Sequence, residues 1–157
     1  MSQYICVDIG GTSIKHGVLD ENAIIKECNQ TKTEAWLGGA AVLDKVKTIG
    51  KQYKEQYENI EGICISTAGM VDPEEGKIVF AGELMPDYTG TCIKKELEKA
   101  LEMPCEVEND VNCAGLAEYV SGSAKESHIM FCATVGTGIG GCAIVNGRVF
   151  HGASNSA

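Results

Sequence analysis

No extended cluster of lysine or arginine occurs in this 157-residue chain, in which 13 basic residues stand against 22 acidic ones for a formal net charge of -9. Nucleic-acid binding needs a basic face that contacts phosphates, so this charge balance argues against a nucleic-acid-binding protein. A polyanionic ligand such as a nucleotide would have to be held by backbone amides, by a metal ion, or by both.

Long apolar runs are also absent, and none approaches the roughly 18–20 residues that a membrane span needs. The N-terminus carries no secretory pattern of basic, apolar and then small residues, because Met1 is followed almost at once by a strand pattern. Apolar residues make up 44% of the chain and charged residues 22%, which is typical of a globular protein with a core. We therefore expect a soluble, cytoplasmic protein that contacts no membrane.

None of the eight cysteines forms a C-x-x-C pair, so the sequence contains neither a zinc-binding motif nor a redox motif of that type. Half of them lie in apolar, strand-like runs, where a free thiol behaves as a small buried hydrophobe. These are Cys6, Cys64, Cys132 and Cys142. A reduced protein is the preferred interpretation and a disulfide-bonded one the alternative. The three scattered histidines are expected as surface or strand residues.

Periodicity predicts three strands followed by helices and strands in alternation, in the order βββαβαβα. This order indicates an α/β domain with a mixed sheet. The expected strands are 4–9, 13–19, one from 23, 63–65 and 105–108. The expected helices run from Trp36 to Tyr57, over 91–101 and over 109–120, the last with Asn109 or Asp110 as its N-cap. Trp36, Tyr53 and Tyr57 are expected to pack against the core.

After Gly122 the pattern restarts with expected strands at 129–135, 142–145 and 148–150, the last two joined by a tight Asn146-Gly147 turn. The segments ICVDIGGTSIKHGVL and FCATVGTGIGGCAIV each read as strand, Gly/Thr turn and strand, which indicates an internal repeat. We therefore expect a complete lobe over 1–122 and an incomplete second lobe over 123–157, in a truncated or partly observed protein.

Two glycine turns could bind phosphate. In DIGGTSIK, the glycines let backbone N–H groups approach phosphate oxygens, Thr12 adds a donor, and Asp8 can hold Mg²⁺ through water. The alternative is an ordinary hairpin turn. The second turn, GTGIGG at 136–141, matches the G-x-G-x-x-G pattern of dinucleotide-binding loops. That pattern must open a helix, whereas strand-type residues follow here, so we reject the dinucleotide interpretation. The two turns occupy equivalent positions in the two repeats, which favours the interpretation that both are phosphate-binding loops.

Two further segments carry candidate site residues. In ENDVNCA (108–114), at a strand-to-helix junction, Asp110 is a candidate for binding a substrate hydroxyl and Asn109 for the neighbouring one, with plain N-capping as the alternative. A carboxylate near a helix N-terminus has a lowered pKa and orients a hydroxyl rather than acting as a strong base. In STAGMVD (66–72), small residues would let a ligand approach the backbone, although a plain loop is the preferred interpretation.

Together these motifs resemble the ROK family of sugar kinases and sugar-responsive repressors, in the actin/hexokinase-like ATPase superfamily. The resemblance covers essentially the whole chain through DIGGTSIK, STAGMVDPEEGKI, ENDVNCAGLAE and VGTGIGG. It implies the actin-like ATPase (ribonuclease H-like) fold with two lobes, ATP and Mg²⁺ between the glycine turns, and a hexose against the ENDVN helix.

By this resemblance, Asp110 matches the catalytic aspartate, Asn109 a sugar-hydroxyl ligand, and Asp8 the magnesium-associated acid. Gly69 falls in the segment that lines the sugar site. The phosphate-loop positions are Gly10, Gly11, Thr12, Lys15, Thr137 and Gly138. The implied reaction is in-line transfer of the γ-phosphoryl group of ATP to a sugar hydroxyl, commonly the 6-hydroxyl, in a homodimeric enzyme.

Two departures from the family pattern matter. The sequence stops before the family's Gly-Glu/His sugar motif and its cysteine-rich zinc site, so no structural zinc ligands are expected here, and the chain alone is not expected to be an efficient kinase. Glu83 stands where many relatives carry asparagine, so glucose, fructose, an N-acetylhexosamine or a β-glucoside all stay open as substrates. The alternatives are a sugar-responsive regulator, which would carry an N-terminal helix-turn-helix, and a sensor, which would typically have lost the aspartate that is present here as Asp110.

Overall fold

The computed structural model describes residues 1–136 and 138–155. Its contacts divide the chain into two compact units, Met1–Glu108 (unit 1) and Asn109–Ala157 (unit 2), and each is described by itself. The expected lobe boundary after Gly122 is not the boundary between these units. The difference arises because helix α3 (Asp110–Val120), which we expect in the first lobe, packs on strands of unit 2.

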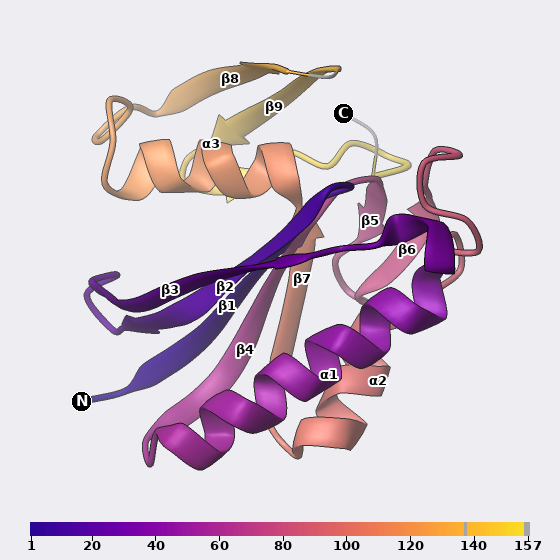
Figure 1. Cartoon of the computed structure of the whole chain (residues 1–157). Coiled ribbons are helices and arrows are strands. Elements are labelled where there is room, and N and C mark those ends of the chain that lie inside the picture. Colours follow the sequence, from indigo (N-terminus) through magenta and orange to yellow (C-terminus); the bar gives the residue numbers. More distant parts are fainter. Residues whose placement is uncertain (137, 156–157) are drawn as a thin grey trace. The chain divides into compact units, whose positions relative to one another are not determined.

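A five-stranded sheet forms the centre of unit 1, in the order β3-β2-β1-β4-β7 (Figure 1). The strands are β1 (Gln3–Ile9), β2 (Ser13–Asp20), β3 (Ile25–Lys32), β4 (Ile60–Thr67) and β7 (Cys105–Asn109). The first three are antiparallel neighbours, whereas β1 and β4 are parallel. The mixed sheet confirms the predicted α/β class.

Two helices, α1 (Gly39–Gln56) and α2 (Ile93–Leu101), cover one face of this sheet (Figure 1). The alternation of strand side chains explains the core: in β1, Ile5, Val7 and Ile9 are buried, while the intervening residues are only half-buried. Burial of each such aliphatic side chain stabilises the fold by about 1.5–3 kcal/mol. The intervening residues Cys6 and Asp8 lie on the face away from the helices.

The helix predicted from Trp36 begins later than expected. Trp36 lies in the short 3₁₀ helix η1 (Ala35–Leu37), and α1 starts after Gly38, whose φ of 88° interrupts the helical path. The prediction that Trp36 packs in the core is wrong, because its side chain is 71% exposed. Tyr53 is buried and Tyr57 packs against the core, which confirms the prediction for these two residues.

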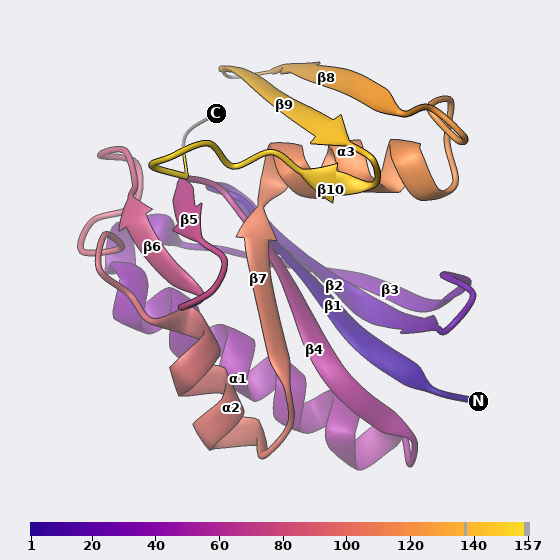
Figure 2. The same ribbon diagram turned by 180° about the vertical axis from the view of Figure 1, so that it is seen from behind.

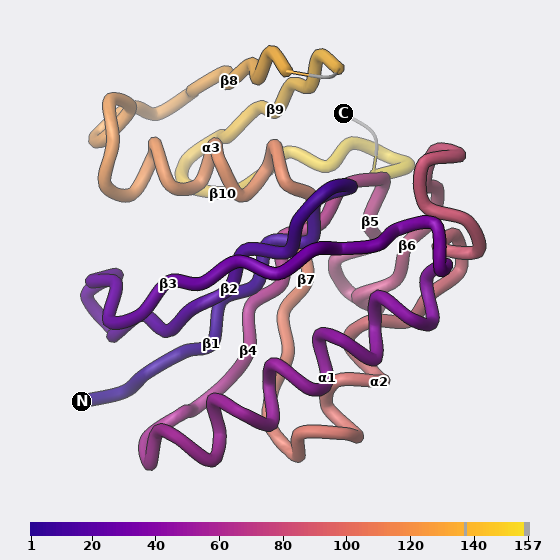
Figure 3. Tube along the Cα trace, in the orientation of Figure 1, coloured from indigo at the N-terminus to yellow at the C-terminus, as the bar shows by residue number. Residues whose placement is uncertain are grey.

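A small hairpin of β5 (Met70–Asp72) and β6 (Lys77–Phe80) occupies the segment that we expect to be a loop. Figure 3 traces it between β4 and α2. Strands of three and four residues are too short for a periodic pattern to reveal. The turn between them uses Gly76 at a φ of 57°, a left-handed conformation that glycine tolerates best.

The cysteines expected to be buried are mostly not buried. Cys142 is buried, Cys6 and Cys132 are half-buried, and Cys64 is exposed. Cys6 and Cys64 lie opposite one another on β1 and β4, on the sheet face away from the helices. The apolar neighbours in the sequence point to the core instead, because adjacent strand residues face opposite sides.

Unit 2 consists of α3 packed on a three-stranded antiparallel sheet, in the order β10-β9-β8. Its strands are β8 (Ile129–Val135), β9 (Ile139–Val145) and β10 (Arg148–Val149). Asn146 and Gly147 have φ values of 49° and 78°, as the predicted tight hairpin requires. Strand β9 begins earlier than expected, so the glycine-rich turn is shorter than the GTGIGG motif.

Among the helices of the described residues, none is both long enough and apolar enough to span a membrane.

Candidate functional site

The carboxylate of Asp8 lies near the end of β1, on the sheet face away from the helices. Its Oδ1 accepts a hydrogen bond of 2.8 Å from Oγ of Ser66, its register partner on parallel strand β4. On the other side, Asp8 pairs in register with Lys15 of β2, and register partners in a sheet share a face. Asp8 and Lys15 are therefore register partners on the same face of the sheet.

The Gly10–Thr12 turn joins β1 to β2. The N–H of Gly10 donates to the carbonyl oxygen of Ser13 at 3.0 Å, and a Cβ at Gly10 would lie only 2.9 Å from that oxygen. Gly11 and Thr12 are exposed, and a Cβ at Gly11 would meet nothing within 4 Å. A ligand can therefore reach the backbone N–H groups here, as the phosphate-loop hypothesis requires.

Gly69 lies just beyond the carboxyl end of β4. Its φ is 104°, and a Cβ would come within 2.8 Å of the carbonyl oxygen of Phe80, so this position needs glycine. The N–H of Ala68 donates to the carbonyl of Ile9 at 3.4 Å, which links the ends of β1 and β4. The Gly69 segment and the Asp8 turn therefore leave the sheet at the same edge.

A buried hydrogen bond supports this segment from within the core. Oγ1 of Thr67 and the hydroxyl of Tyr88 lie 2.8 Å apart, and both residues are almost fully buried. Burial raises the pKa of Tyr88 to about 12, so this hydroxyl stays protonated at physiological pH. The contact fixes the backbone that leads into Gly69.

At the N-terminus of α3, Asn109 is the cap, which confirms one of the two expected alternatives. Its Oδ1 accepts from the N–H groups of Val111 at 2.9 Å and Asn112 at 3.2 Å. Its Nδ2 donates to Oδ1 of Asp110 at 3.0 Å. The side chain of Asp110 is thus oriented by its neighbour, in the first turn of the helix.

The second glycine turn, between β8 and β9, lies in the same unit as Asp110. The N–H of Gly136 donates to the carbonyl of Gly138 at 2.9 Å. A Cβ at Gly140 would lie 2.4 Å from Cγ2 of Val111, so this glycine permits β9 to approach the start of α3. Thr137, a predicted phosphate-loop residue, lies outside the described residues.

The carboxyl ends of parallel strands in a sheet are where α/β proteins generally place their ligands. Strand β7 runs in the same direction as β4 (Figure 2) and leads directly into Asn109 and Asp110. Within unit 1, the segments after β1 and after β4 thus leave the sheet at the same end. Each carries residues that the sequence motifs single out.

A magnesium ion fits the donor set at Asp8. The carboxylate is a hard oxygen ligand, and Mg²⁺ commonly takes one or two such groups and keeps its remaining waters. In the part of the chain that the structure describes, no three His, Cys, Asp or Glu residues form a cluster that could hold a metal ion. A single carboxylate such as that of Asp8 suits an ion that keeps most of its water ligands.

The family model described as "ROK family" matches residues 4–157. The chain belongs to the ROK family. It is 53% identical to an uncharacterised Clostridium perfringens protein, with 100% of this chain and 53% of that protein covered. It is 33% identical to a β-glucoside kinase of Listeria monocytogenes, with 92% of this chain and 47% of that kinase covered. The chain spans about half the length of the curated relatives it matches.

Solved structures agree with this family assignment. A ROK family glucokinase from Streptomyces griseus, in complex with glucose and AMPPNP, has a TM-score of 0.87 and 30% identity. The match covers 99% of this chain and 48% of that glucokinase. A ROK hexokinase from Thermus thermophilus has a TM-score of 0.83 over 98% of this chain and 50% of its own. These likenesses confirm the expected actin-like ATPase fold.

Sequence reasoning missed Ser66 as the partner of Asp8. We place it at the start of a loop, whereas it is the penultimate residue of β4. Its role depends on the parallel register of two strands that lie far apart in the sequence, which no local pattern reveals.

Proposed function

We propose that the protein transfers the γ-phosphoryl group of ATP to a hydroxyl of a hexose or hexose derivative, at the 6-hydroxyl. The carrying observation is the start of α3, where Asn109 caps the helix and orients the carboxylate of Asp110 by a 3.0 Å hydrogen bond. Relatives named β-glucoside kinase and glucokinase, at 33% and 32% identity, support this reaction class.

In this proposal Asp110 accepts or orients the proton of the attacking hydroxyl, while Asn109 and Gly69 contact the sugar. The exposed turn at Gly10–Thr12, with Lys15, contacts the phosphates of ATP. Gly138 and Thr137 belong to the second phosphate loop. Hydrated Mg²⁺ next to Asp8 would offset charge on the phosphates. Positioning and electrostatic stabilisation by these groups would supply most of the rate acceleration.

The substrate stays open among glucose, fructose, an N-acetylhexosamine and a β-glucoside, and we infer a homodimer in the cytoplasm for the complete protein. The test is sugar-dependent ADP release by the complete gene product with Mg-ATP, against a panel of these sugars. A rate with one sugar would establish the kinase and name its substrate. Sugar binding without turnover would favour a regulator or sensor, and no binding would contradict the assignment of the site.

Replacement of Asp110 by asparagine tests the catalytic assignment. Asp110→Asn keeps the shape of the side chain but removes the proton acceptor, so we expect kcat to fall by at least about 10²-fold. Asp44→Asn, which removes an exposed carboxylate from α1, is the matched control and should leave kcat unchanged. Near-normal turnover of Asp110→Asn would refute the role of Asp110.

A further inference from the structure

Thr33, which follows β3 directly, contacts the Gly10–Thr12 turn from the protein interior. Its N–H donates to the carbonyl oxygen of Thr12 at 3.0 Å, and its Oγ1 donates to the carbonyl oxygen of Gly10 at 2.6 Å. Thr33 is 0% exposed, so no water competes for these bonds. One buried residue therefore holds two of the three carbonyl groups of this turn.

These two bonds set the direction of the amide groups on the other side of the turn. In a planar trans peptide, the carbonyl of one residue and the N–H of the next point in opposite directions. With the carbonyls of Gly10 and Thr12 directed at Thr33, the N–H groups of Gly11 and Ser13 are directed away from it. Gly11 is exposed, so its N–H is available to an anion.

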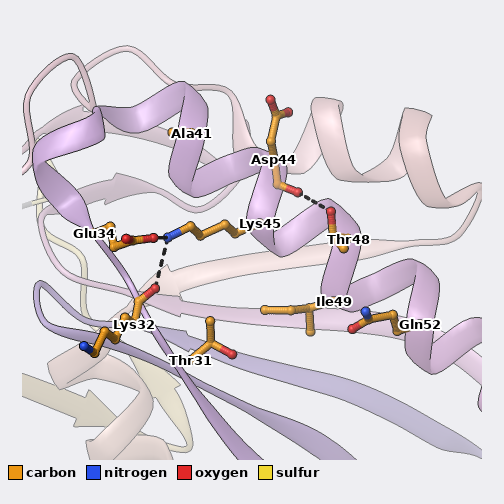
Figure 4. A pocket seen from close by; sticks show the side chains of 9 residues that line it. All are labelled: Thr31, Lys32, Glu34, Ala41, Asp44, Lys45, Thr48, Ile49 and Gln52. Carbon is orange, nitrogen blue, oxygen red and sulfur yellow. Dashed lines mark hydrogen bonds and ion pairs between the residues drawn. The ribbon is translucent and has the colours of Figure 1, made fainter.

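Lys45 of α1 fixes the backbone at Thr33. Its Nζ donates to the carbonyl oxygens of Lys32 at 3.1 Å and Thr33 at 3.0 Å, and it pairs with the carboxylate of Glu34. A lysine ammonium has three donors, and these three partners use all of them. Figure 4 shows Lys45 reaching from α1 toward the end of β3.

Lys32, Glu34 and Lys45 also line a groove between β3 and α1 (Figure 4), with a volume of about 650 Å³. The groove is lined by Thr31, Lys32, Glu34, Ala41, Asp44, Lys45, Thr48, Ile49 and Gln52. All three N–H donors of the Lys45 ammonium are used by bonds to the chain itself. We therefore interpret the contact of Lys45 with Thr33 as a support for the Gly10–Thr12 turn rather than as a ligand site.

We propose that Thr33 and Lys45 are positioning residues that aim the amides of the Gly10–Thr12 turn at the phosphates of the nucleotide. The proposal rests on the proposed function, because it assigns the turn to ATP. It predicts that weakening either the contact of Lys45 with Thr33 or that of Thr33 with the turn lowers the affinity for nucleotide and leaves the affinity for sugar unchanged. A contact that only joins β3 to α1 would change stability and leave the affinity for nucleotide unaltered.

The experiment measures binding of Mg-AMPPNP to the complete gene product by calorimetry, together with thermal unfolding. Thr33→Val is nearly isosteric and removes the hydroxyl donor to Gly10 while keeping the N–H bond to Thr12. We expect Mg-AMPPNP to bind about fivefold to tenfold more weakly, as the loss of one buried hydrogen bond implies. Thr33→Ser restores the hydroxyl and should bind within about twofold of the wild type.

Lys45→Met removes the ammonium and keeps most of the aliphatic stem, and we expect about threefold to fivefold weaker binding. Lys47→Met is the matched control, because Lys47 lies on the same helix and also pairs with carboxylates, those of Asp44 and Glu96. It changes the net charge equally but does not touch the turn. Its affinity should equal that of the wild type.

The outcomes separate this inference from the proposed function. If the wild type binds Mg-AMPPNP and Thr33→Val and Lys45→Met bind it equally well, the positioning roles are refuted while the nucleotide site stands. Equal weakening by Lys45→Met and Lys47→Met would also refute them, since charge alone would then be responsible. If the wild type does not bind Mg-AMPPNP, the nucleotide assignment itself fails. Should Thr33→Val not fold, the two lysine variants and Thr33→Ser decide.

Discussion

Ser66 and Cys64 illustrate how strand register decides the surroundings of single residues in this protein. The parallel pairing of β1 with β4 places Ser66 opposite Asp8. Two residues earlier in each strand, and on the same face of the sheet, it places Cys64 opposite Cys6. A hydrogen bond from Cys6 lowers the pKa of the Cys64 thiol from 9.0 to about 7. Cys64 is exposed, so this thiol is accessible to reagents.

We therefore expect Cys64 to react with iodoacetamide at a rate that rises with pH and has its midpoint near pH 7. The thiolate is the reactive form, so it accumulates as pH rises through the pKa. In Cys6→Ala the hydrogen bond is lost, the pKa should return toward 9.0, and the rate at pH 7 should fall about tenfold. Peptide mass spectrometry after timed labelling measures each cysteine separately.

Cys28, which is exposed on β3, provides the control for this labelling experiment. Its labelling rate should be the same in the wild type and in Cys6→Ala, because strand β2, with Gly17 at this level of the sheet, separates Cys28 from Cys6. An unchanged pH profile of Cys64 in Cys6→Ala would show that Cys6 does not stabilise its thiolate.

At the scale of elements, α3 depends on glycines that let it approach β9 closely. A Cβ at Gly115 would lie 2.4 Å from Sγ of the buried Cys142 and 3.3 Å from Cε of Met130. Gly140 makes the equivalent space at the helix N-terminus, beside Val111. The contact between α3 and β9 therefore depends on small residues on both elements.

Gly115→Ala is expected to destabilise the protein by about 1–2 kcal/mol. Alanine favours the helix by up to about 1 kcal/mol, but overpacking against Cys142 costs about 1–3 kcal/mol. Thermal or denaturant unfolding measures the change. Adding Cys142→Ala should relieve the clash, so the double variant should be more stable than the sum of the two single changes predicts. A higher melting temperature for Gly115→Ala alone would contradict the close packing.

Most elements of the chain were predictable because their signals are local. Strand β8 occurs at its predicted bounds, the Asn146-Gly147 hairpin forms, and Asn109 caps α3. The β5–β6 hairpin was missed because its strands are short, and α1 was predicted to start too early because Trp36 fits a helical stripe that Gly38 interrupts. Periodicity detects long amphipathic segments and overlooks such interruptions.

At the scale of the molecule, the β8–β9 sheet of unit 2 has one apolar face that is open to solvent. Alternate residues of β8 face α3, and the intervening ones are exposed. Phe131 is 73% exposed, Val135 84% and Ile139 85%. Exposed apolar patches of this kind promote association or bind apolar dyes.

We expect the 157-residue chain by itself to bind the dye ANS and to self-associate, and Phe131→Glu to reduce both. A charge on this face interrupts the patch and opposes apolar contact. Leu84→Glu is the matched control, since Leu84 is 79% exposed but lies in unit 1. Dye fluorescence and sedimentation velocity measure the effect. Equal changes in the two variants would mean that net charge, and not this face, controls association.

The amino-acid sequence by itself determined the α/β class, the order of most elements, the two glycine turns and the capped helix that carries Asp110. Each depends on residues close together in the chain, where alternation, capping and turn chemistry act. Tertiary structure alone decided that Ser66 binds Asp8, that Thr33 supports the Gly10–Thr12 turn, and that Trp36 is exposed. These facts depend on strand register and on the packing of distant segments, and no local pattern of residues specifies either.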